Sequence, residues 1–374
     1  MIHRAKFQNF KALRDVEVTF DSRLTVLVGP NGSGKTSVLQ GLEIVCRVVS
    51  GGGDGSLPHP PRPGGVFSSS TSMPQVGIEN LTELAACRSS SLREFNLTLG
   101  CWMRDGRGAE VTAGIECSRN SSRDEVQKRF VNPSKQGEMF SRALLLRLDP
   151  ALLASPSIVT SNPPLMHPSG AGLPSTLAYT ALNQPDDFKL ISDALRVVIP
   201  AIDRIRFDKK LTGGSYGGSY GDSIIFDFRG APSIGAAHAS NGTLCALGLL
   251  TSILGPDRPR LVLLDDLDHG LHPKAQMELI GVLRALLARF PDLQIIATSH
   301  SPYILNQLAW NEVRVTGLRD DGSAICARLE DHPEVERWRE AMTPGEFWSH
   351  IGDDWVKKLD KPQVEQPQPA PVAL

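Results

Sequence analysis

The stretch from Leu24 to Thr36 constrains this chain of 374 residues more than any other, because it reads LTVLVGPNGSGKT. A short apolar run leads into Gly29, and Gly34, Lys35 and Thr36 follow at the spacing G-x-x-x-x-G-K-[ST]. In such a P-loop, glycines let successive backbone N–H groups turn toward a polyphosphate at the start of the next helix. The sequence therefore predicts a strand, a P-loop and a helix that together bind a nucleoside triphosphate.

The residues of this loop have separate predicted tasks. Lys35 would reach the β- and γ-phosphates, while the Thr36 hydroxyl would be a ligand of Mg²⁺. The loop and the residue after it are the predicted nucleotide contacts: Gly29, Pro30, Asn31, Gly32, Ser33, Gly34, Lys35, Thr36 and Ser37.

Two further apolar runs end in polar residues that suit phosphate chemistry. The run 260–264 precedes Asp265 and Asp266, and the run 293–298 comes shortly before His300. At the edge of a sheet, Asp265 would hold Mg²⁺ through water, and Asp266 would polarise the water that attacks the γ-phosphate. His300 could hydrogen-bond that water or the γ-phosphate. The alternatives are an ordinary strand-to-loop Asp pair and a histidine with only a structural role.

The residues Ser240-Asn241-Gly242-Thr243 open an apolar helix predicted over 243–254. Small hydroxyl and glycine residues at a helix N-terminus can bind an anion, but a serine there is equally a plain N-cap. The local sequence leaves both interpretations open. An amphipathic helix over 273–289 separates the two apolar runs, and this alternation predicts parallel strands joined by crossover helices.

Composition excludes several other classes of protein. Hydrophobic residues make up 41% and charged residues 21%, which is ordinary for a globular protein. The six cysteines never form a CxxC pair, so neither a zinc site nor a disulfide framework is expected. The N-terminus lacks the apolar segment of a signal peptide, and no apolar stretch is long enough to span a bilayer. We therefore expect a cytoplasmic protein without membrane contact.

The charge pattern gives no strong indication of nucleic-acid binding. A net charge of −2 creates no global basic field, so any such surface would have to be local. Arg204, Arg206, Lys209 and Lys210 form a small basic cluster, for which a solvated face is the commoner explanation. Binding of DNA or RNA stays open.

Patterns along the rest of the chain predict its organisation. Alternating apolar residues predict strands before Val28 and a hairpin over 95–117, and helical spacing predicts two helices within 173–198. Composition rich in Gly, Pro and Ser predicts flexible chain over 51–75 and 211–222. The domains that we expect are a head over 1–50 and 222–318, a flexible loop over 51–75, an inserted α/β region over 76–221 with a helical part near 173–198, an extension over 319–360 and a disordered Pro-rich tail over 361–374.

Five segments of the chain match one family pattern in order. They are IHRAKFQNFKALRDVEVTF as an opening hairpin, GPNGSGKT as Walker A, ASNGTLCALGLL as the start of a signature helix, LLDDLDHGLHPKAQ as Walker B with a D-loop, and ATSHSPYIL as a switch-histidine strand. With these segments the chain resembles the ABC-type ATPase heads of the SMC, RecF and overcoming-lysogenization-defect (OLD) class. The likeness is greatest to compact AAA-family ATPases without coiled coils from bacterial toxin and phage-defence loci. It implies an α/β fold: a P-loop head with a mixed or antiparallel β lobe, a parallel core sheet and an inserted α+β region.

The resemblance also implies an activity, the hydrolysis of ATP to ADP and phosphate with ATP and Mg²⁺ bound. Two heads would enclose two ATP molecules, as a homodimer or higher oligomer, and hydrolysis would separate them. Because the chain after His300 is too short for a nuclease domain of ordinary size, the implied effector, a nuclease or toxin, would be a separate protein. The implied roles are catalysis for Asp266, His300 and Lys35, Mg²⁺ binding for Thr36 and Asp265, signature contacts to the other subunit for Ser240, Asn241, Gly242 and Thr243, and a D-loop at Leu271 and His272.

Three departures from the family pattern keep other functions open. Asp266 stands where the family more often has Glu, SNGT replaces SGGQ in the signature, and Gln75 is only a weak candidate for the Q-loop. The shorter Asp266 side chain motivates an alternative, an ATP-binding scaffold that hardly hydrolyses ATP. A second alternative, the ATPase subunit of a transporter, is disfavoured by the long spacing from Thr36 to Ser240.

Overall fold

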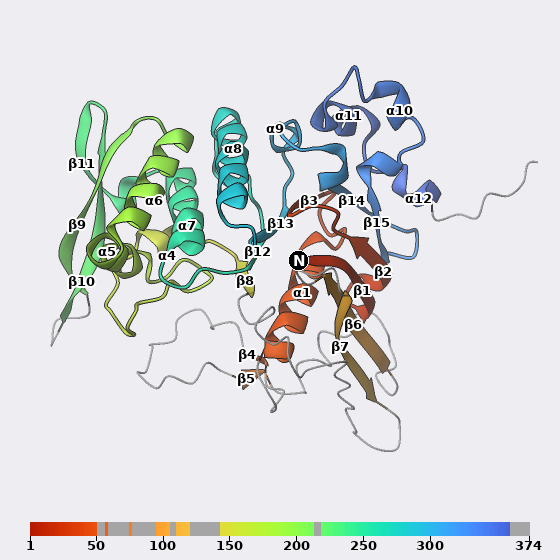
Figure 1. Ribbon diagram of the computed structural model, residues 1–374, viewed down its shortest axis with the longest axis horizontal. Helices are drawn as coiled ribbons and strands as arrows, with labels where there is room; N and C mark the ends of the chain where they lie inside the picture. The colour runs from red at the N-terminus through yellow and green to blue at the C-terminus, as the bar shows by residue number, and fades with distance from the viewer. Residues whose placement is uncertain are drawn as a thin grey trace, which may run out of the picture.

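The computed structural model describes residues 1–50, 57–58, 75–76, 95–104, 110–119, 143–212 and 218–359, and Figure 1 shows them arranged about a central sheet. This sheet has six strands in the order β15-β14-β3-β13-β12-β8. Five of them run parallel, and β15 pairs antiparallel with β14 at one edge. The strands are β3 (Leu24–Val28), β8 (Ala143–Leu146), β12 (Leu261–Leu264), β13 (Gln294–Thr298), β14 (Val313–Leu318) and β15 (Ala324–Arg328).

The strand order decides which loops meet. β13 pairs with β3 on one side and with β12 on the other. Because all three are parallel, their carboxyl ends lie at one edge of the sheet. The P-loop, the Asp265-Asp266 pair and the turn before His300 follow these three strands, so segments far apart in the sequence converge at that edge.

A second, antiparallel sheet contains the opening hairpin. Its order is β2-β1-β6-β7. The hairpin expected over 95–117 is confirmed, with a register that runs from Phe95 opposite Arg119 to Arg104 opposite Glu110. The strands are β1 (Ile2–Phe10), β2 (Leu13–Thr19), β6 (Phe95–Arg104) and β7 (Glu110–Arg119).

Helix α1 (Lys35–Ser50) lies against the face of the central sheet that the antiparallel sheet also covers (Figure 1). Its stripe of Val38, Leu39 and Leu42 is fully buried, together with Leu27 and Ile296 of the central strands. The neighbouring residues along these strands point to the opposite face, since side chains alternate along a strand. Both faces of the parallel strands are therefore buried, which explains their unbroken apolar sequence.

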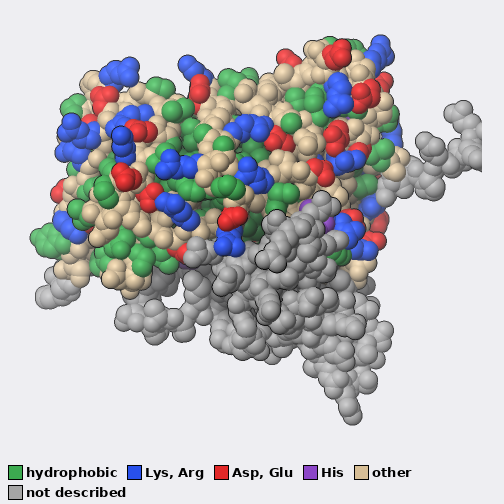
Figure 2. Space-filling model, viewed as in Figure 1, with side chains coloured by type: hydrophobic (Ala, Val, Ile, Leu, Met, Phe, Trp, Pro, Cys, Tyr) green, Lys and Arg blue, Asp and Glu red, His purple; other side chains and the backbone are tan. Residues whose placement is uncertain are grey.

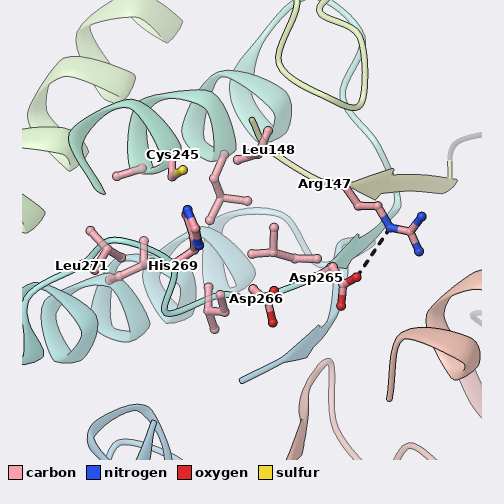
Figure 3. Close-up of a pocket in the computed structure, with 12 residues that line it drawn as sticks. Arg147, Leu148, Cys245, Asp265, Asp266, His269 and Leu271 are labelled. Atoms are coloured by element: carbon pink, nitrogen blue, oxygen red, sulfur yellow. Dashed lines mark ion pairs between the residues drawn. The ribbon is translucent and has the colours of Figure 1, made fainter. Parts of the chain in front are cut away.

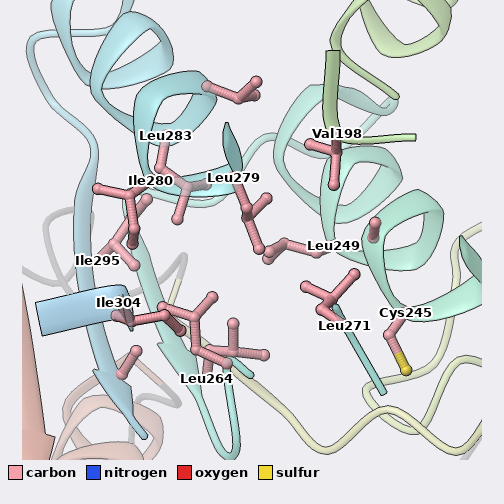
Figure 4. Packing of buried hydrophobic residues seen from close by; sticks show 14 of the residues in the cluster. Val198, Cys245, Leu249, Leu264, Leu271, Leu279, Ile280, Leu283, Ile295 and Ile304 are labelled. Carbon is pink, nitrogen blue, oxygen red and sulfur yellow. The ribbon is translucent and has the colours of Figure 1, made fainter. Parts of the chain in front are cut away.

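The opposite face is covered mainly by helices. Figure 4 shows Leu279, Ile280 and Leu283 of α8 packed toward Leu264 and Ile295 of the sheet, with α6 and α7 completing the cluster. The elements on this side are α4 (Pro150–Ala154), α5 (Leu173–Asn183), α6 (Pro185–Val198), α7 (Asn241–Leu254), α8 (Pro273–Arg289) and α9 (Pro302–Leu305).

A third sheet of β9 (Ile202–Thr212), β10 (Ser219–Phe228) and β11 (Ala231–Gly235) lies beside these helices (Figure 1). The charged run in β9 gave no strand prediction, yet Ile202 and Ile205 are buried while most of the charged residues of the strand are exposed. The flexible tract expected over 211–222 is wrong at its ends. Residues 211–212 and 219–222 pair as antiparallel strands, and 213–217 lie outside the described residues.

Strand pairing crosses the expected limits of two domains. From the region 76–221, β8 pairs with β12, and β6 pairs with β1. From the extension 319–360, β15 pairs with β14, so the sheets of the head draw on most of the chain. The loop expected over 51–75 lies outside the described residues, except for 57–58 and 75, and so does the tail over 361–374. The short elements that remain are β4 (Leu57–Pro58), β5 (Gln75–Val76), α10 (Val335–Trp338), α11 (Pro344–Ile351) and α12 (Val356–Leu359).

The side chain of Gln75, the weak Q-loop candidate, is likewise not described. Within the described ranges, no helix combines the length and the apolar character needed to cross a membrane.

Candidate functional site

The P-loop lies between the end of β3 and the start of α1, as its sequence predicts. Gly29 has φ +139°, and a Cβ there would lie 2.2 Å from the carbonyl oxygen of Thr316. Both the left-handed backbone and the contact with β14 therefore require glycine at this position. Where the P-loop leaves β3, its backbone therefore lies in close contact with the neighbouring strand β14.

A buried pair of hydroxyl groups ties the loop to β14. Ser33 Oγ lies 2.6 Å from Thr316 Oγ1, which donates to the Val28 carbonyl oxygen at 2.9 Å. Because the Thr316 hydroxyl has one proton and gives it to Val28, the Ser33 hydroxyl is the donor to Thr316. Thr316 was not predicted, since its place beside the loop arises only from the pairing of β14 with β3.

Lys35 is almost completely buried at the start of α1. Its Nζ donates to the carbonyl oxygens of Gly29 and Pro30 at 2.8 and 2.9 Å. Burial lowers the pKa of Lys35, and the nearby carboxylates of Asp266, Asp353, Asp265 and Asp268 oppose this shift. The ammonium group thus lies among backbone oxygens of the loop and within the field of four carboxylates.

Asp265 connects three of the converging strand ends. Thr36 Oγ1 and Thr298 Oγ1 both donate to its Oδ1, at 3.0 and 2.9 Å. Its other oxygen, Oδ2, lies 3.5 Å from Nε of Arg147, an ion pair drawn in Figure 3. The structure thus brings Thr36 and Asp265 together as the sequence predicts. Arg147 was not predicted, because nothing in its own segment indicates that β8 ends beside β12.

Asp266 adopts φ +57°, a left-handed conformation that is uncommon for a residue with a side chain. Its N–H donates to Thr298 Oγ1 at 2.9 Å, which fixes the turn after β12. Its carboxylate is exposed, yet desolvation by the surrounding strand ends raises its pKa, and Asp265 and Asp268 raise it further. A carboxylate with a raised pKa is a better proton acceptor than an ordinary aspartate.

The turn after β13 is held by Asp268, which sequence reasoning also missed. Ser299 Oγ and the His300 N–H donate to Asp268 Oδ1, at 2.7 and 3.2 Å. The imidazole of His300 lies close enough to Asp266 to oppose the rise in its pKa. The predicted pair of Asp266 and His300 is therefore assembled at the same edge as the P-loop.

The C-terminal segment adds one more carboxylate to this edge. Trp348 Nε1 donates to Asp353 Oδ1 at 2.7 Å. Burial raises the pKa of Asp353, while that hydrogen bond, Lys35 and His300 oppose the rise. Asp353 was not predicted, because it follows α11 and reaches the site only through the packing of α12 beside β14.

The predicted signature residues occupy the start of α7, where Ser240 is an N-cap. Its Oγ accepts from the Thr243 N–H at 3.2 Å and lies 2.8 Å from Thr243 Oγ1. A Cβ on Gly242 would lie 2.3 Å from the carbonyl oxygen of Gly270, so this helix start packs tightly on the turn after β12. Figure 1 places α7 and α1 well apart, with β12 and β13 between them. Within one chain, the signature residues therefore lie away from the P-loop.

The predicted D-loop residues complete the turn between β12 and α8. Leu271 is buried beside α7, and the His272 side chain caps α8, accepting from the Lys274 N–H at 3.3 Å. A cavity of about 280 Å³ is lined by this turn, by α7 beyond its first residues and by Arg147 and Leu148, and Figure 3 shows Cys245 and His269 facing it. Asp265 and Asp266 lie at one end of its lining and Leu271 at the other. The cavity thus runs from the carboxylate pair toward the signature helix.

The oxygen atoms at this edge suit Mg²⁺. Among the described residues, no group of three or more His, Cys, Asp and Glu side chains could enclose a metal ion. Mg²⁺ in nucleotide sites uses one or two protein oxygens and completes its shell with phosphates and water. The hydroxyl of Thr36 and the carboxylate of Asp265, 3.0 Å apart, are donors of this kind.

Comparison with the sequences of known proteins identifies a matching family and a relative. A family model for AAA domains, described as "putative AbiEii toxin, Type IV TA system", matches residues 24–306. The Septu protein PtuA of Bacillus thuringiensis is 37% identical over 95 residues, which make up 25% of this chain and 22% of that protein. The alignment thus spans less than a quarter of this curated relative.

Two solved structures share the fold at low sequence identity. An SMC head bound to the C-terminal winged-helix domain of ScpA superposes with a TM-score of 0.57 at 13% identity, covering 87% of this chain and 96% of that one. An Smc head with an extended coiled coil, bound to the C-terminal domain of ScpA from Pyrococcus furiosus, gives 0.52 at 11% identity, covering 91% and 99%. The fold class expected from the sequence is therefore confirmed. With its P-loop, its converging strand ends and a family match over most of its length, the chain belongs to the AAA-domain family of putative AbiEii toxins of type IV toxin–antitoxin systems.

Proposed function

We propose that this chain binds and hydrolyses ATP, closes with a second copy around the nucleotide and thereby controls a separate effector protein. One observation carries the proposal. The P-loop, the Asp265-Asp266 pair and His300 follow three adjacent parallel strands, and Thr36 Oγ1 lies 3.0 Å from Asp265 Oδ1. Membership of an ATPase-domain family supports ATP as the ligand.

The residues at this edge have distinct tasks in the proposed reaction. Lys35 and the backbone N–H groups of the P-loop would bind the phosphates, and Thr36 and Asp265 would hold Mg²⁺. When bound, Mg²⁺ neutralises charge on the β- and γ-phosphate oxygens. Asp266 would orient the attacking water and accept its proton, since its raised pKa suits a general base. His300 would hydrogen-bond the γ-phosphate.

The second copy would complete the site through its signature residues. Ser240 and Asn241 are exposed at the start of α7, where another subunit can reach them. Likeness to SMC heads supports this arrangement. Release of phosphate would then separate the heads and make the nucleotide a switch of dimer geometry. The Septu relative supports a role in anti-phage defence beside an effector that is a nuclease or toxin.

The charges on the face in Figure 2 and in the cluster around β9 support a protein effector, rather than a nucleic acid, as the proposed main partner. Basic and acidic side chains are intermixed on the face shown in Figure 2. In the basic cluster around β9, Arg206 pairs with Asp227 and Lys209 with Asp222, each at 2.7 Å. Because these basic side chains are paired with carboxylates, they support the interpretation of the cluster as a solvated face rather than a phosphate-binding surface.

Multiple-turnover release of phosphate from ATP tests the proposed activity. We expect the purified chain to release more than one phosphate per subunit, and Lys35→Ala to abolish this release because the phosphates lose their cation. Arg339→Gln, which removes an exposed arginine far along the chain, is the matched control and should hydrolyse ATP normally. A Lys35→Ala variant as active as the wild type would overturn the proposal.

A second candidate function is an ATP-binding scaffold with little turnover. The observation that favours it is Asp266, one methylene shorter than glutamate and held at φ +57°. Nucleotide binding without multiple turnover in the wild type, together with a gain of turnover in Asp266→Glu, would identify the scaffold.

A further inference from the structure

Arg147 follows β8 and is the residue through which that strand contacts the proposed nucleotide site. Its Nε lies 3.5 Å from Asp265 Oδ2 (Figure 3), whereas Thr36 and Thr298 donate to the other oxygen, Oδ1. Within the described part of the chain, no other cationic side chain lies within 4.0 Å of Asp265. The roles proposed above leave this guanidinium group without a function.

The backbone at Arg147 is held rigidly on both sides. Its N–H donates to the Pro168 carbonyl oxygen at 3.0 Å, and the preceding carbonyl, of Leu146, accepts from the Asp265 N–H at 3.1 Å. The next turn is capped by Asp149, whose Oδ1 accepts from the Ala151 N–H at 2.8 Å. The Cα of Arg147 is therefore fixed at the edge of the sheet, and only the side chain is free to reorient.

The side chain itself is held loosely. It is 45% exposed, against 16% for Asp265, and the shortest distance between the two groups, 3.5 Å, is longer than an ordinary hydrogen bond. A half-exposed ion pair of this kind contributes little to stability, so it separates at low cost. The backbone of Arg147 is thus fixed, while its cationic side chain can move at the rim of the site.

The negative charge at this edge of the sheet indicates a role for the guanidinium group of Arg147. Asp265, Asp266 and Asp268 lie close enough to one another that two of them raise the pKa of the third. An anionic triphosphate that enters such a site needs cations, and Lys35 supplies one. A planar guanidinium group matches two phosphate oxygens at once, which an ammonium group cannot do.

We propose that Arg147 is a phosphate-binding residue that exchanges partners: its guanidinium leaves Asp265 and pairs with the phosphate chain of the nucleotide while Asp265 turns to Mg²⁺. The inference rests on the proposed function and deepens it, because it names a second cation for the same site. The pairing with Asp265 keeps the carboxylate neutralised and the guanidinium near its target until the nucleotide binds.

Equilibrium binding of fluorescent nucleotides tests this assignment without relying on turnover. A non-hydrolysable triphosphate analogue and the corresponding monophosphate are titrated, with Mg²⁺, into the wild type, Arg147→Gln, Arg147→Lys and the control Arg339→Gln. Arg339 is 40% exposed and pairs with Glu336 at 2.8 Å, which makes it a matched surface ion pair. Thermal unfolding of each variant verifies that it is folded.

We expect Arg147→Gln to weaken triphosphate binding by about tenfold or more, as loss of a charge-assisted contact to phosphate does. Binding of the monophosphate should change by less than about threefold, because the contact is with the outer phosphates. Arg147→Lys should recover part of the affinity and Arg339→Gln should match the wild type. Unchanged triphosphate binding in Arg147→Gln, or equal weakening of both nucleotides, would overturn the inference.

The same titrations separate this inference from the proposed function. If the wild type binds no nucleotide, or Lys35→Ala binds it normally, the proposed function itself fails. If Lys35→Ala loses binding while Arg147→Gln retains it, only the role of Arg147 fails.

The exchange of partners has its own test in the absence of Mg²⁺. Asp265→Asn should tighten binding of the triphosphate, since it removes negative charge and also frees Arg147. The gain should be larger in the wild-type background than in Arg147→Gln, a coupling that a double-mutant cycle measures. Equal gains in both backgrounds would contradict the exchange.

Discussion

At the scale of single residues, the P-loop depends on a hydroxyl group that it does not contain. Thr316→Val should lower the free energy of unfolding by about 1–3 kcal/mol, because the buried Ser33 hydroxyl loses its acceptor. Urea unfolding measures the change, and Thr316→Ser, which keeps the hydroxyl, is the matched control. Equal losses in the valine and serine variants would show that the hydroxyl pair contributes nothing.

The raised pKa of Asp266 makes a prediction about pH. Its carboxylate holds a proton up to a higher pH than an ordinary aspartate does, because of desolvation and of Asp265 and Asp268. As the pH falls through this raised pKa, the proposed base is protonated and ATP hydrolysis should decline. Phosphate release measured between about pH 5 and pH 8 checks this decline. Asp266→Asn should reduce the rate of ATP hydrolysis by about 100-fold or more and abolish the decline of the remaining rate at low pH.

The same shift predicts a gain in stability on neutralising Asp266. A carboxyl whose pKa is higher in the folded than in the unfolded protein stabilises the fold at low pH, and this contribution is lost as the pH rises through the folded pKa. Asp266→Asn should therefore unfold at a higher temperature than the wild type at neutral pH, since asparagine also tolerates φ +57°. The difference should vanish in acid. A variant less stable than the wild type at neutral pH would contradict the shift.

At the scale of elements, two glycines in helices make opposite predictions. Gly242→Ala places a Cβ 2.3 Å from the Gly270 carbonyl oxygen and should force α7 away from the turn after β12. Gly281→Ala in α8 meets nothing within 4 Å and should stabilise the protein by about 0.5–1 kcal/mol through helix propensity. Denaturant unfolding of both variants measures the contrast. A Gly242→Ala variant as stable as Gly281→Ala would show that this packing does not constrain α7.

At the scale of the whole molecule, the nucleotide should control association. Native mass measurement of Asp266→Asn with ATP and Mg²⁺ should show a dimer that the same variant without ATP lacks, because slowed hydrolysis would trap the closed pair. Ser240→Arg should prevent this dimer by placing a long side chain at the signature contact. Asn183→Arg, an equal change at an exposed helix end, is the control. A dimer that forms regardless of ATP and survives Ser240→Arg would exclude the arrangement.

Local patterns were enough to predict much of the fold. The sequence predicted the P-loop, the amphipathic helix over 273–289 and the strands that end before Asp265 and His300. Each of these elements can be recognised from a short stretch of sequence with one motif or one spacing of apolar residues. β9 was not predicted because most of its residues are charged, and most of these are exposed to solvent. Its few buried apolar residues do not form a recognisable alternating pattern. Alternation of β-strands and helices also predicted that these strands run parallel, but not the strand order that brings Thr36 and Asp265 together.

The sequence by itself determined which residues lie at the edge of the sheet, since a P-loop and polar strand ends are local features of the chain. Only the tertiary structure decided what surrounds them. Thr316, Arg147 and Asp353 reach the site from other strands and from the C-terminal segment, through contacts between residues separated by more than a hundred positions or through the packing of a short helix. Such contacts follow from strand order and packing, which no single segment encodes.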